Sequence, residues 1–199
     1  MQPEPNQSLN YEMIQHSSYN NGYITGVLLT KYLLELEKSN HDELTGLLNR
    51  RGLIDELKDQ DLSNFTLIYC DVNNFKKIND LFGHNKGDYF LQQLGNQLKK
   101  SYRPEDLIAR LGGDEFILLI NHQQRGLETT NEETKINLIK NRFSEIVSSI
   151  ITSQPNEYHQ QNLNIAFGVV NFKTNDDLFS MIERADQLMY QSKRNLKDL

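Results

Sequence analysis

Three acidic residues follow or separate apolar runs of the chain, where their carboxylates could hold a divalent cation. Asp71 comes directly after the apolar run 65–70, and Asp114 and Glu115 lie between two further apolar runs. If those two runs form a hairpin that pairs beside the first strand, the carboxylates converge at one sheet edge, where their repulsion requires a counter-charge. Mg²⁺ prefers one or two carboxylates together with substrate phosphates. The pattern therefore predicts a magnesium site for a nucleoside triphosphate, suited to in-line phosphoryl displacement.

The glycines beside the hairpin acids have two interpretations. Gly112 and Gly113 remove side chains next to Asp114, which would let a phosphate or a sugar approach the backbone. An ordinary hairpin turn explains one or both glycines equally well. Acidic residues at strand ends and in turns are commonly solvated, so neither the glycines nor Asp71 alone decides between a site and a turn.

Basic side chains lie at intervals from which they could reach phosphates. Lys76 and Lys77 follow Asp71 closely, and Lys193 and Lys197 belong to a later amphipathic segment. The alternative is that such cations compensate a helix dipole or lie on a solvated face. Their spacing alone does not decide between these two roles.

An amide and a carboxylate flank the glycine-containing stretch 83–87. Asn79 and Asp88 could read the edge of a guanine, the carboxylate accepting hydrogen bonds from N1–H and N2–H. Each could equally be a helix cap or a turn residue.

Composition limits the remaining function classes. The chain has 199 residues and a net charge of −6, so it does not favour nucleic-acid or membrane-surface binding. The single cysteine, Cys70, excludes an internal disulfide and a cysteine-based metal cage. The N-terminal residues do not resemble a signal peptide, and no apolar run is long enough to span a bilayer. We therefore expect a cytoplasmic protein.

Apolar periodicity predicts one α+β domain after a polar tail and an N-terminal helix. We expect a linker or partner-docking segment over 1–40 and the domain over 41–199. The expected elements are helices over 19–38, 50–60, 74–81, about 91–98, 136–150 and 178–189, strands over 65–70, 107–111, 116–120 and 163–172, a turn over 83–87, and a loop over 123–133. This order favours helices over one face of a mainly antiparallel sheet.

Five segments in order resemble the GGDEF family of diguanylate cyclases. They are Asp42–Arg51, Asp71–Asp80, Phe82–Asp88, Arg110–Phe116 and Ala185–Lys193. The resemblance extends from about residue 41 to residue 197 and leaves residues 1–40 outside it. It implies a palm-like, ferredoxin-like sheet with flanking helices, as in nucleotide cyclases. It also implies the conversion of two GTP molecules into cyclic di-GMP and two diphosphates by a homodimer.

The resemblance also implies residue roles. Asp71 and Asp114, helped by the Val72 carbonyl, would hold Mg²⁺ or, in its place, Mn²⁺. Glu115 would assist metal binding or activate the 3′-hydroxyl. Asn79 and Asp88 would read guanine, and the triphosphate would be lined by Phe75, Lys76, Gly112, Gly113, Lys193 and Lys197.

Arg103 and Asp106 have the RxxD spacing that binds the product cyclic di-GMP and inhibits the enzyme in relatives. An arginine fork suits a phosphate or the Hoogsteen edge of guanine, while the alternative is a charged, solvated turn. Two departures from the family pattern stand out. Asn73 replaces a frequent aspartate, and Lys197 replaces an arginine and loses its bidentate fork.

Two hypotheses follow from these patterns. The first is an active diguanylate cyclase with GTP as substrate and cyclic di-GMP as product and inhibitor. The second is a weak or inactive GGDEF module that binds GTP or cyclic di-GMP and signals through protein partners. The intact acidic pair of Asp114 and Glu115 favours the first hypothesis. In either case residues 1–40 could contact a sensor or a partner protein.

Overall fold

The computed structural model describes residues 28–31, 39–122, 131–173 and 176–197, with only the backbone of 192 and 194–197. The chain divides into two units, Met1–Ser39 and Asn40–Leu199. Of the helix expected over 19–38, residues 28–31 are helical, and the remainder lies outside the described residues. No helix within the described ranges is long and apolar enough to cross a membrane.

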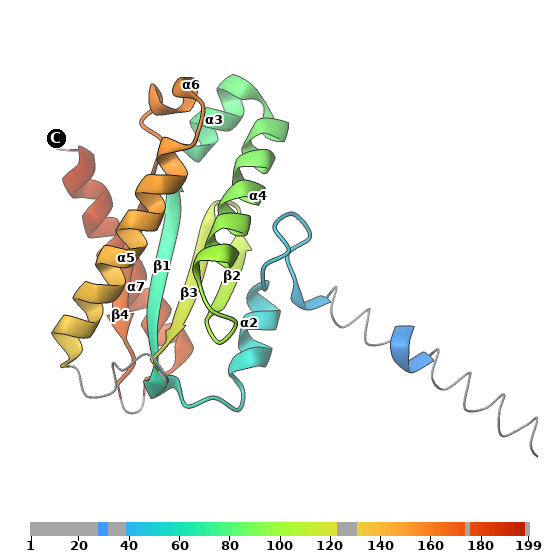
Figure 1. The fold of residues 1–199 in the computed structure, drawn as a ribbon, viewed down its shortest axis with the longest axis vertical. Coiled ribbons are helices and arrows are strands. Elements are labelled where there is room, and N and C mark those ends of the chain that lie inside the picture. The colour runs from blue at the N-terminus through green and yellow to red at the C-terminus, as the bar shows by residue number, and fades with distance from the viewer. Residues whose placement is uncertain (1–27, 32–38, 123–130, 174–175, 198–199) are drawn as a thin grey trace, which may run out of the picture. The chain divides into compact units, whose positions relative to one another are not determined.

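The second unit is built on one antiparallel sheet with the strand order β2-β3-β1-β4 (Figure 1). The strands are β1 (Phe65–Asn73), β2 (Leu107–Gly112), β3 (Glu115–Asn121) and β4 (Asn164–Asn171). The helices are α2 (Arg50–Leu57), α3 (Phe75–Phe82), α4 (His84–Ser101), α5 (Glu132–Thr152), α6 (Asn156–His159) and α7 (Leu178–Lys197), with a 3₁₀ turn over Leu62–Asn64. The predicted α+β class is confirmed, and the hairpin β2–β3 pairs beside β1.

The expectation that helices cover one face of the sheet was wrong, because they cover both. On one face the side chains of α4 and α5 pack with alternate strand residues such as Ile68 and Leu118. On the other face α2 and α7 pack with the residues between them, such as Leu67 and Leu119. Strands that are apolar at nearly every position are buried on both sides. The sheet is therefore the middle layer of three.

Four predicted boundaries also differ from the structure. The stretch 83–87 is not a turn, because α4 begins at His84 and includes Gly87. The expected loop over 123–133 ends earlier, since Glu132 already opens α5, and 123–130 lies outside the described residues. The helix expected over 50–60 ends at Leu57. Strand β1 runs past Cys70 to Asn73, which places Asp71 inside the strand.

A glycine lets α7 lie directly on the sheet. A Cβ atom at Gly168 of β4 would stand 2.0 Å from the carbonyl oxygen of Ala185 and 2.8 Å from the amide nitrogen of Met189. Both atoms belong to the backbone of α7, so a side chain at this position would push the helix away. This close approach sets the position from which α7 carries Lys193 to the end of β1.

Candidate functional site

An open cleft lies where the predicted carboxylates gather at one end of the sheet. Asp71 and Val72 come from β1, Asp114 from the β2–β3 turn, and Lys193 from α7. The cleft has a volume of about 990 Å³, and its other walls are Asn73, Asn74, Phe75, Lys76, His159, Asn162, Leu163 and Asn164. We call this space the acidic cleft. Its volume lies at the upper end of the range of ligand pockets, about 300–1,000 Å³.

Like charges meet in the acidic cleft. Burial raises the pKa of the Asp114 carboxyl above its usual value, and the neighbouring charge of Asp71 raises it further. The ammonium of Lys193 lies 2.5 Å from Oδ1 of Asp71 and is its counter-charge. The backbone N–H of Val72 donates to the carbonyl of Asp114 at 3.2 Å, which ties the hairpin turn to β1. The cleft therefore holds two close carboxylates, one of which is paired with a cation.

Glu115, the third predicted acid, has a different environment. Its Cα lies opposite that of Asp71 in the β1–β3 register. Its Oε1 accepts a hydrogen bond of 2.8 Å from the hydroxyl of Tyr69. Burial, and then the bond to Glu115, raise the pKa of Tyr69 far above its usual value, so the phenol keeps its proton. Among the described residues, those that line the acidic cleft do not include Glu115.

The donor set of the acidic cleft fits a hard divalent cation. Asp71 and Asp114 are close enough to repel each other, and burial disfavours the charge on Asp114 unless a cation is present. The described residues contain no cluster of three or more His, Cys, Asp or Glu that could hold a metal alone. Two carboxylates with room for substrate oxygens match the coordination that Mg²⁺ adopts in nucleotide enzymes.

A network of hydrogen bonds from outside the cleft holds the hairpin turn. Nε and Nη2 of Arg110 donate to the carbonyl of Gly113 at 3.0 and 2.8 Å. Nη1 of the same guanidinium contacts both carboxylate oxygens of Asp42, at 2.9 and 3.1 Å. Asp42 also accepts hydrogen bonds from the backbone and hydroxyl of Thr45. This arrangement connects the segment 42–45 to the turn that carries Asp114.

The two turn glycines allow this arrangement. Gly112 and Gly113 have φ angles of 145° and 54°, in the region that favours glycine. The turn therefore accounts for both glycines, as the plainer interpretation of the sequence expects. It also leaves Gly113 exposed beside the acidic cleft.

The predicted guanine-reading residues lie on two neighbouring helices, α3 and α4. A Cβ atom at Gly87 would stand 1.8 Å from Oδ1 of Asn79, so only a glycine leaves room for that amide. Oδ1 of Asn79 is buried and has no hydrogen-bond partner. Asp88 follows Gly87 and is exposed. A buried acceptor without a donor is unusual in a folded protein and is expected where a ligand supplies the donor.

The remaining predicted phosphate contacts are distributed along the cleft. Phe75 and Lys76 begin α3 and line the acidic cleft with Lys193. Lys197 is the last residue of α7, and its side chain lies outside the described residues. The first amides of a helix lack intrahelical acceptors, so the start of α3 suits an anion.

The wall opposite α3 was not predicted from the sequence. His159, Asn162 and Asn164 reach the acidic cleft from α6 and the start of β4. Nδ2 of Asn74 donates to the carbonyls of Gln161 and Asn162, both at 3.1 Å, and so joins the two walls. These contacts link residues 87 and 88 positions apart, a pairing that no local pattern reveals.

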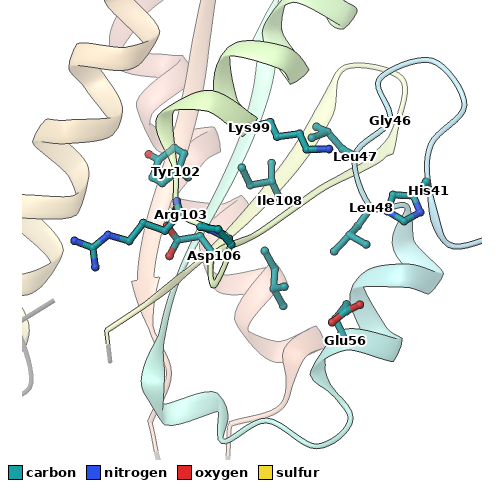
Figure 2. Close-up of a pocket in the computed structure, with 12 residues that line it drawn as sticks. His41, Gly46, Leu47, Leu48, Glu56, Lys99, Tyr102, Arg103, Asp106 and Ile108 are labelled. Atoms are coloured by element: carbon teal, nitrogen blue, oxygen red, sulfur yellow. Dashed lines mark hydrogen bonds between the residues drawn. The ribbon is translucent and has the colours of Figure 1, made fainter. Parts of the chain in front are cut away.

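The RxxD residues line a second, smaller pocket of about 410 Å³, shown in Figure 2. Asp106 is buried, and its two oxygens accept hydrogen bonds from the backbone N–H groups of Arg103 and Asn121 at 3.0 and 2.9 Å. The aspartate therefore holds its own turn. Arg103 is exposed, and Figure 2 shows its side chain pointing away from Lys99 and Glu56.

Comparison with known proteins identifies relatives of this chain. The family described as "Diguanylate cyclase, GGDEF domain" matches residues 39–198. Diguanylate cyclase DgcP of Pseudomonas aeruginosa is 34% identical over 170 residues, which cover 81% of this chain and 24% of that protein. Diguanylate cyclase DgcP of Escherichia coli is 32% identical over 172 residues, which cover 80% and 46%. The chain thus spans less than half the length of these two relatives.

Solved structures share the fold. The coiled coil and GGDEF domain of DgcB from Caulobacter crescentus, in complex with c-di-GMP, superposes with a TM-score of 0.71 at 22% identity, covering 95% of this chain and 96% of that one. Diguanylate cyclase SiaD from Pseudomonas aeruginosa, in complex with its activator SiaC, gives a TM-score of 0.64 at 23% identity, covering 95% and 74%. At these identities the likeness establishes the fold alone.

Proposed function

The chain belongs to the GGDEF family of diguanylate cyclases, and from that premise we propose that it condenses two GTP molecules into cyclic di-GMP and two diphosphates. In each half-reaction a 3′-hydroxyl oxygen bonds to the α-phosphorus of the other GTP, the bond from that phosphorus to diphosphate breaks, and the hydroxyl proton is released. The observation that carries this proposal is the meeting of Asp71, Asp114 and Lys193 in one nucleotide-sized cleft.

Diguanylate cyclases of this family are generally metal-dependent, and Asp71, Asp114 and the Val72 carbonyl are the groups that would hold Mg²⁺ or Mn²⁺ here. The ion would neutralise phosphate charge and lower the pKa of the attacking hydroxyl. Lys193 and Lys76 would hold the phosphates in line, with the first amides of α3. Gly112 and Gly113 leave the turn open to phosphate or sugar. Glu115 lies opposite Asp71 in the β1–β3 register and would assist metal binding or activate the attacking 3′-hydroxyl.

The base is proposed to be guanine. Asn79 presents a buried oxygen without a partner, which suits an N–H donor on the base. Asp88 follows Gly87 on α4 and could accept from N1–H and N2–H. A carboxylate cannot donate to the N1 acceptor of adenine, so this pair favours GTP over ATP.

A second copy of the chain is proposed to bring the second GTP. One acidic cleft holds one attacking hydroxyl and one α-phosphate of the same nucleotide, which cannot react with each other in line. Two clefts that face each other satisfy both attacks. We also propose a partner or sensor contact through residues 1–40, a role for which the SiaD–SiaC activator complex is a precedent.

Product inhibition through Arg103 and Asp106 is a separate proposal. The exposed guanidinium of Arg103 supports it, since it suits a phosphodiester although it points away from Lys99 in this structure, and Lys99 lines the same pocket. Asp106 would act mainly by fixing the turn that presents Arg103, because both of its oxygens accept from the backbone.

The test is turnover by the purified chain. Incubation with GTP and Mg²⁺ at high protein concentration, with and without a fused dimerising tag, should yield cyclic di-GMP detected by mass spectrometry. ATP should yield no cyclic product, and Asp114→Asn should form cyclic di-GMP from GTP roughly 10²- to 10³-fold more slowly than the wild type. Tight GTP binding without any product in either format would contradict the cyclase proposal and support a binding module.

A further inference from the structure

The ammonium of Lys193 is the counter-charge that the protein itself places among the carboxylates of the acidic cleft. It lies 2.5 Å from Oδ1 of Asp71, and both side chains are partly buried, at 25% and 16% exposed. Burial and the charge of Asp71 raise the pKa of Asp114, whereas the charge of Lys193 acts in the opposite direction. The ammonium therefore acts on both acids. Within the described ranges, the other ion pairs involve neither of them.

The helix that carries Lys193 is fixed, but the lysine side chain is flexible. Helix α7 lies directly on the sheet at Gly168, where a Cβ atom would meet the helix backbone at 2.0 Å. A lysine carries its charge on a flexible four-carbon stem with three donors. Phe75 and Lys76, at the start of α3, line the same cleft. The ammonium can therefore turn from Asp71 towards phosphates held at α3 without a shift of α7.

Each ligand of the acidic cleft meets a charge of its own sign when it binds alone. A divalent cation is attracted by Asp71 and Asp114 but repelled by the ammonium of Lys193, whether that ammonium stays on Oδ1 or moves aside. A triphosphate is attracted by the ammonium but repelled by the two carboxylates. When both ligands bind together, the cation faces the carboxylates and the phosphate oxygens accept from the ammonium. The arrangement favours the metal–nucleotide complex over either ligand alone.

We propose that Lys193 exchanges partners on ligand binding: its ammonium pairs with Asp71 in the nucleotide-free protein and passes to the phosphates when a metal–nucleotide complex enters. This proposal rests on the proposed function of the cleft and adds a cause for cooperative binding of its two ligands. A lysine that only held phosphates would strengthen nucleotide binding and leave the affinity for a bare cation unchanged. A lysine that exchanges partners strengthens nucleotide binding and weakens the affinity for the bare cation.

The test is a pair of titrations on Lys193→Met, which keeps an unbranched side chain and removes the charge. Binding of Mn²⁺ to the nucleotide-free protein, followed by electron paramagnetic resonance of the free ion, should tighten about five- to tenfold, a usual size for coupling between two ligands. Binding of a non-hydrolysable GTP analogue with Mg²⁺ should weaken about tenfold, the size of one lost charge-assisted hydrogen bond. The factor by which the analogue tightens Mn²⁺ binding should therefore fall.

Two further variants isolate the charge at this position. Lys193→Arg keeps the charge and should leave the Mn²⁺ affinity of the nucleotide-free protein within about twofold of wild type, as expected if charge and not shape opposes the ion. Lys76→Met removes a cation that lines the same cleft but forms no ion pair with the described acids. It should weaken analogue binding and leave the Mn²⁺ affinity unchanged. Lys193→Gln should reproduce the shifts of Lys193→Met and replaces it if urea unfolding shows that the methionine variant is unfolded.

Three results would overturn the exchange. They are an Mn²⁺ affinity in Lys193→Met no higher than in wild type, an equal gain in Lys193→Arg, and an equal gain in Lys76→Met. These titrations do not depend on turnover. If the chain makes no cyclic di-GMP while Lys193→Met still shifts the two affinities in opposite directions, the cyclase proposal fails and the exchange stands. If product forms and the Mn²⁺ affinity does not change, the cyclase proposal stands and the exchange fails.

Discussion

The two ends of the β1–β4 strand pair differ in whether their polar side chains find hydrogen-bond partners within the chain. At the end away from the acidic cleft, Thr66 donates to Asn171, Asn171 donates to Glu132, and Lys135 lies 3.4 Å from the same glutamate. His122 completes the chain at 2.6 Å from the Thr66 hydroxyl. Because that hydroxyl donates to Asn171, the Nε2 atom of His122 must carry the hydrogen that Thr66 accepts.

At the acidic cleft, by contrast, buried polar groups lack partners within the described part of the chain. Asp114 is partly buried beside another carboxylate, and the buried oxygen of Asn79 has no partner. Thr66 and Asn171 are at least as buried as Asp114, yet the Thr66 hydroxyl donates to Asn171 and the Asn171 amide donates to Glu132. The difference indicates where the fold relies on a ligand: a polar group that the chain leaves unsatisfied is one that a substrate or an ion completes.

The largest expected effect tests the cleft end. Asp114→Asn should lower the turnover number roughly 10²- to 10³-fold, the scale for losing one group that stabilises transition-state charge. It should not destabilise the fold in the absence of Mg²⁺. The pKa of Asp114 is raised in the folded state, so its favourable contribution is present below pH 3.8 and is lost as the pH rises through the folded pKa. An asparagine at this position does not titrate, so the variant does not lose stability as the pH rises.

Steady-state kinetics and urea unfolding at pH 7, with and without Mg²⁺, measure both effects. Mg²⁺ should stabilise the wild-type protein more than the variant. Equal stabilisation of the two proteins by Mg²⁺ would show that Asp114 does not bind the metal. It would also contradict the view that the acidic cleft relies on a ligand.

The next largest effect concerns the end of the β1–β4 strand pair that lies away from the acidic cleft. Thr66→Val keeps the shape of the side chain but leaves His122 and Asn171 without their shared partner. The free energy of unfolding should fall by about 1–3 kcal/mol for each buried group left unsatisfied. Urea denaturation measures the loss, and the turnover number at 25 °C should stay within twofold of wild type. A variant that keeps its stability but loses activity would show that the two ends are not functionally distinct.

A smaller effect tests the contacts of Arg110 with Asp42 and Gly113, which lie outside the acidic cleft and which we call the clamp. Asp42→Asn removes the charge that Arg110 contacts, so the turn bearing Asp114 loses its support. We expect a roughly tenfold lower turnover number, since catalytic groups displaced by a fraction of an ångström lose rate in this range. Arg110→Lys should have a similar effect because lysine cannot reach Asp42 and Gly113 at once. An unchanged rate in both variants would contradict this role.

The same clamp predicts a dependence on pH. Burial raises the pKa of Asp42, but hydrogen bonds from Thr45 and Arg110 outweigh it and leave the pKa below 3.8. A lowered pKa means that the carboxylate stabilises the fold above pH 3.8 and that this contribution disappears as the pH falls through the folded value. The urea midpoint should therefore fall less steeply below pH 4 in Asp42→Asn than in wild type. Parallel curves would contradict the assignment.

The smallest effect concerns the base. Gly87→Ala introduces a Cβ that would meet Oδ1 of Asn79 at 1.8 Å, so the amide must turn away. Because that atom ends a flexible side chain, the fold should tolerate the change. The KM for GTP should rise by roughly three- to tenfold with little change in turnover number, as for lost uniform binding. Asn96→Ala, at an exposed position elsewhere on α4, is the control and should leave the KM unchanged.

The sequence predicts the layers of the fold better than the partners at the site. The continuous apolar run of β1 and the hairpin around Gly112 and Gly113 were sufficient for the antiparallel sheet. The same run should have predicted helices on both faces, because a strand without polar positions has no solvated side. The polar start of α4 was missed since His84–Gly87 has no apolar period.

Long-range pairings explain what the sequence left open at the site. Asp42 and Arg110 lie 68 residues apart, and Tyr69 and Glu115 lie 46 apart. Tyr69 belongs to an apolar run, where an aromatic ring is expected for packing alone. Only the β1–β3 register places its hydroxyl beside an acid. Residue types suggested the carboxylates of the cleft, but which acid pairs with which partner depends on the folded register.

The contact between Lys193 and Asp71 spans 122 residues of sequence. At about 5–20 residues per second, a ribosome needs on the order of 6–24 s to synthesise that length of chain. Throughout this interval the nascent β1 strand exposes an acid whose counter-charge has not yet been translated. A domain synthesised in this order gains the counter-charge of Asp71 only after α7 has been translated.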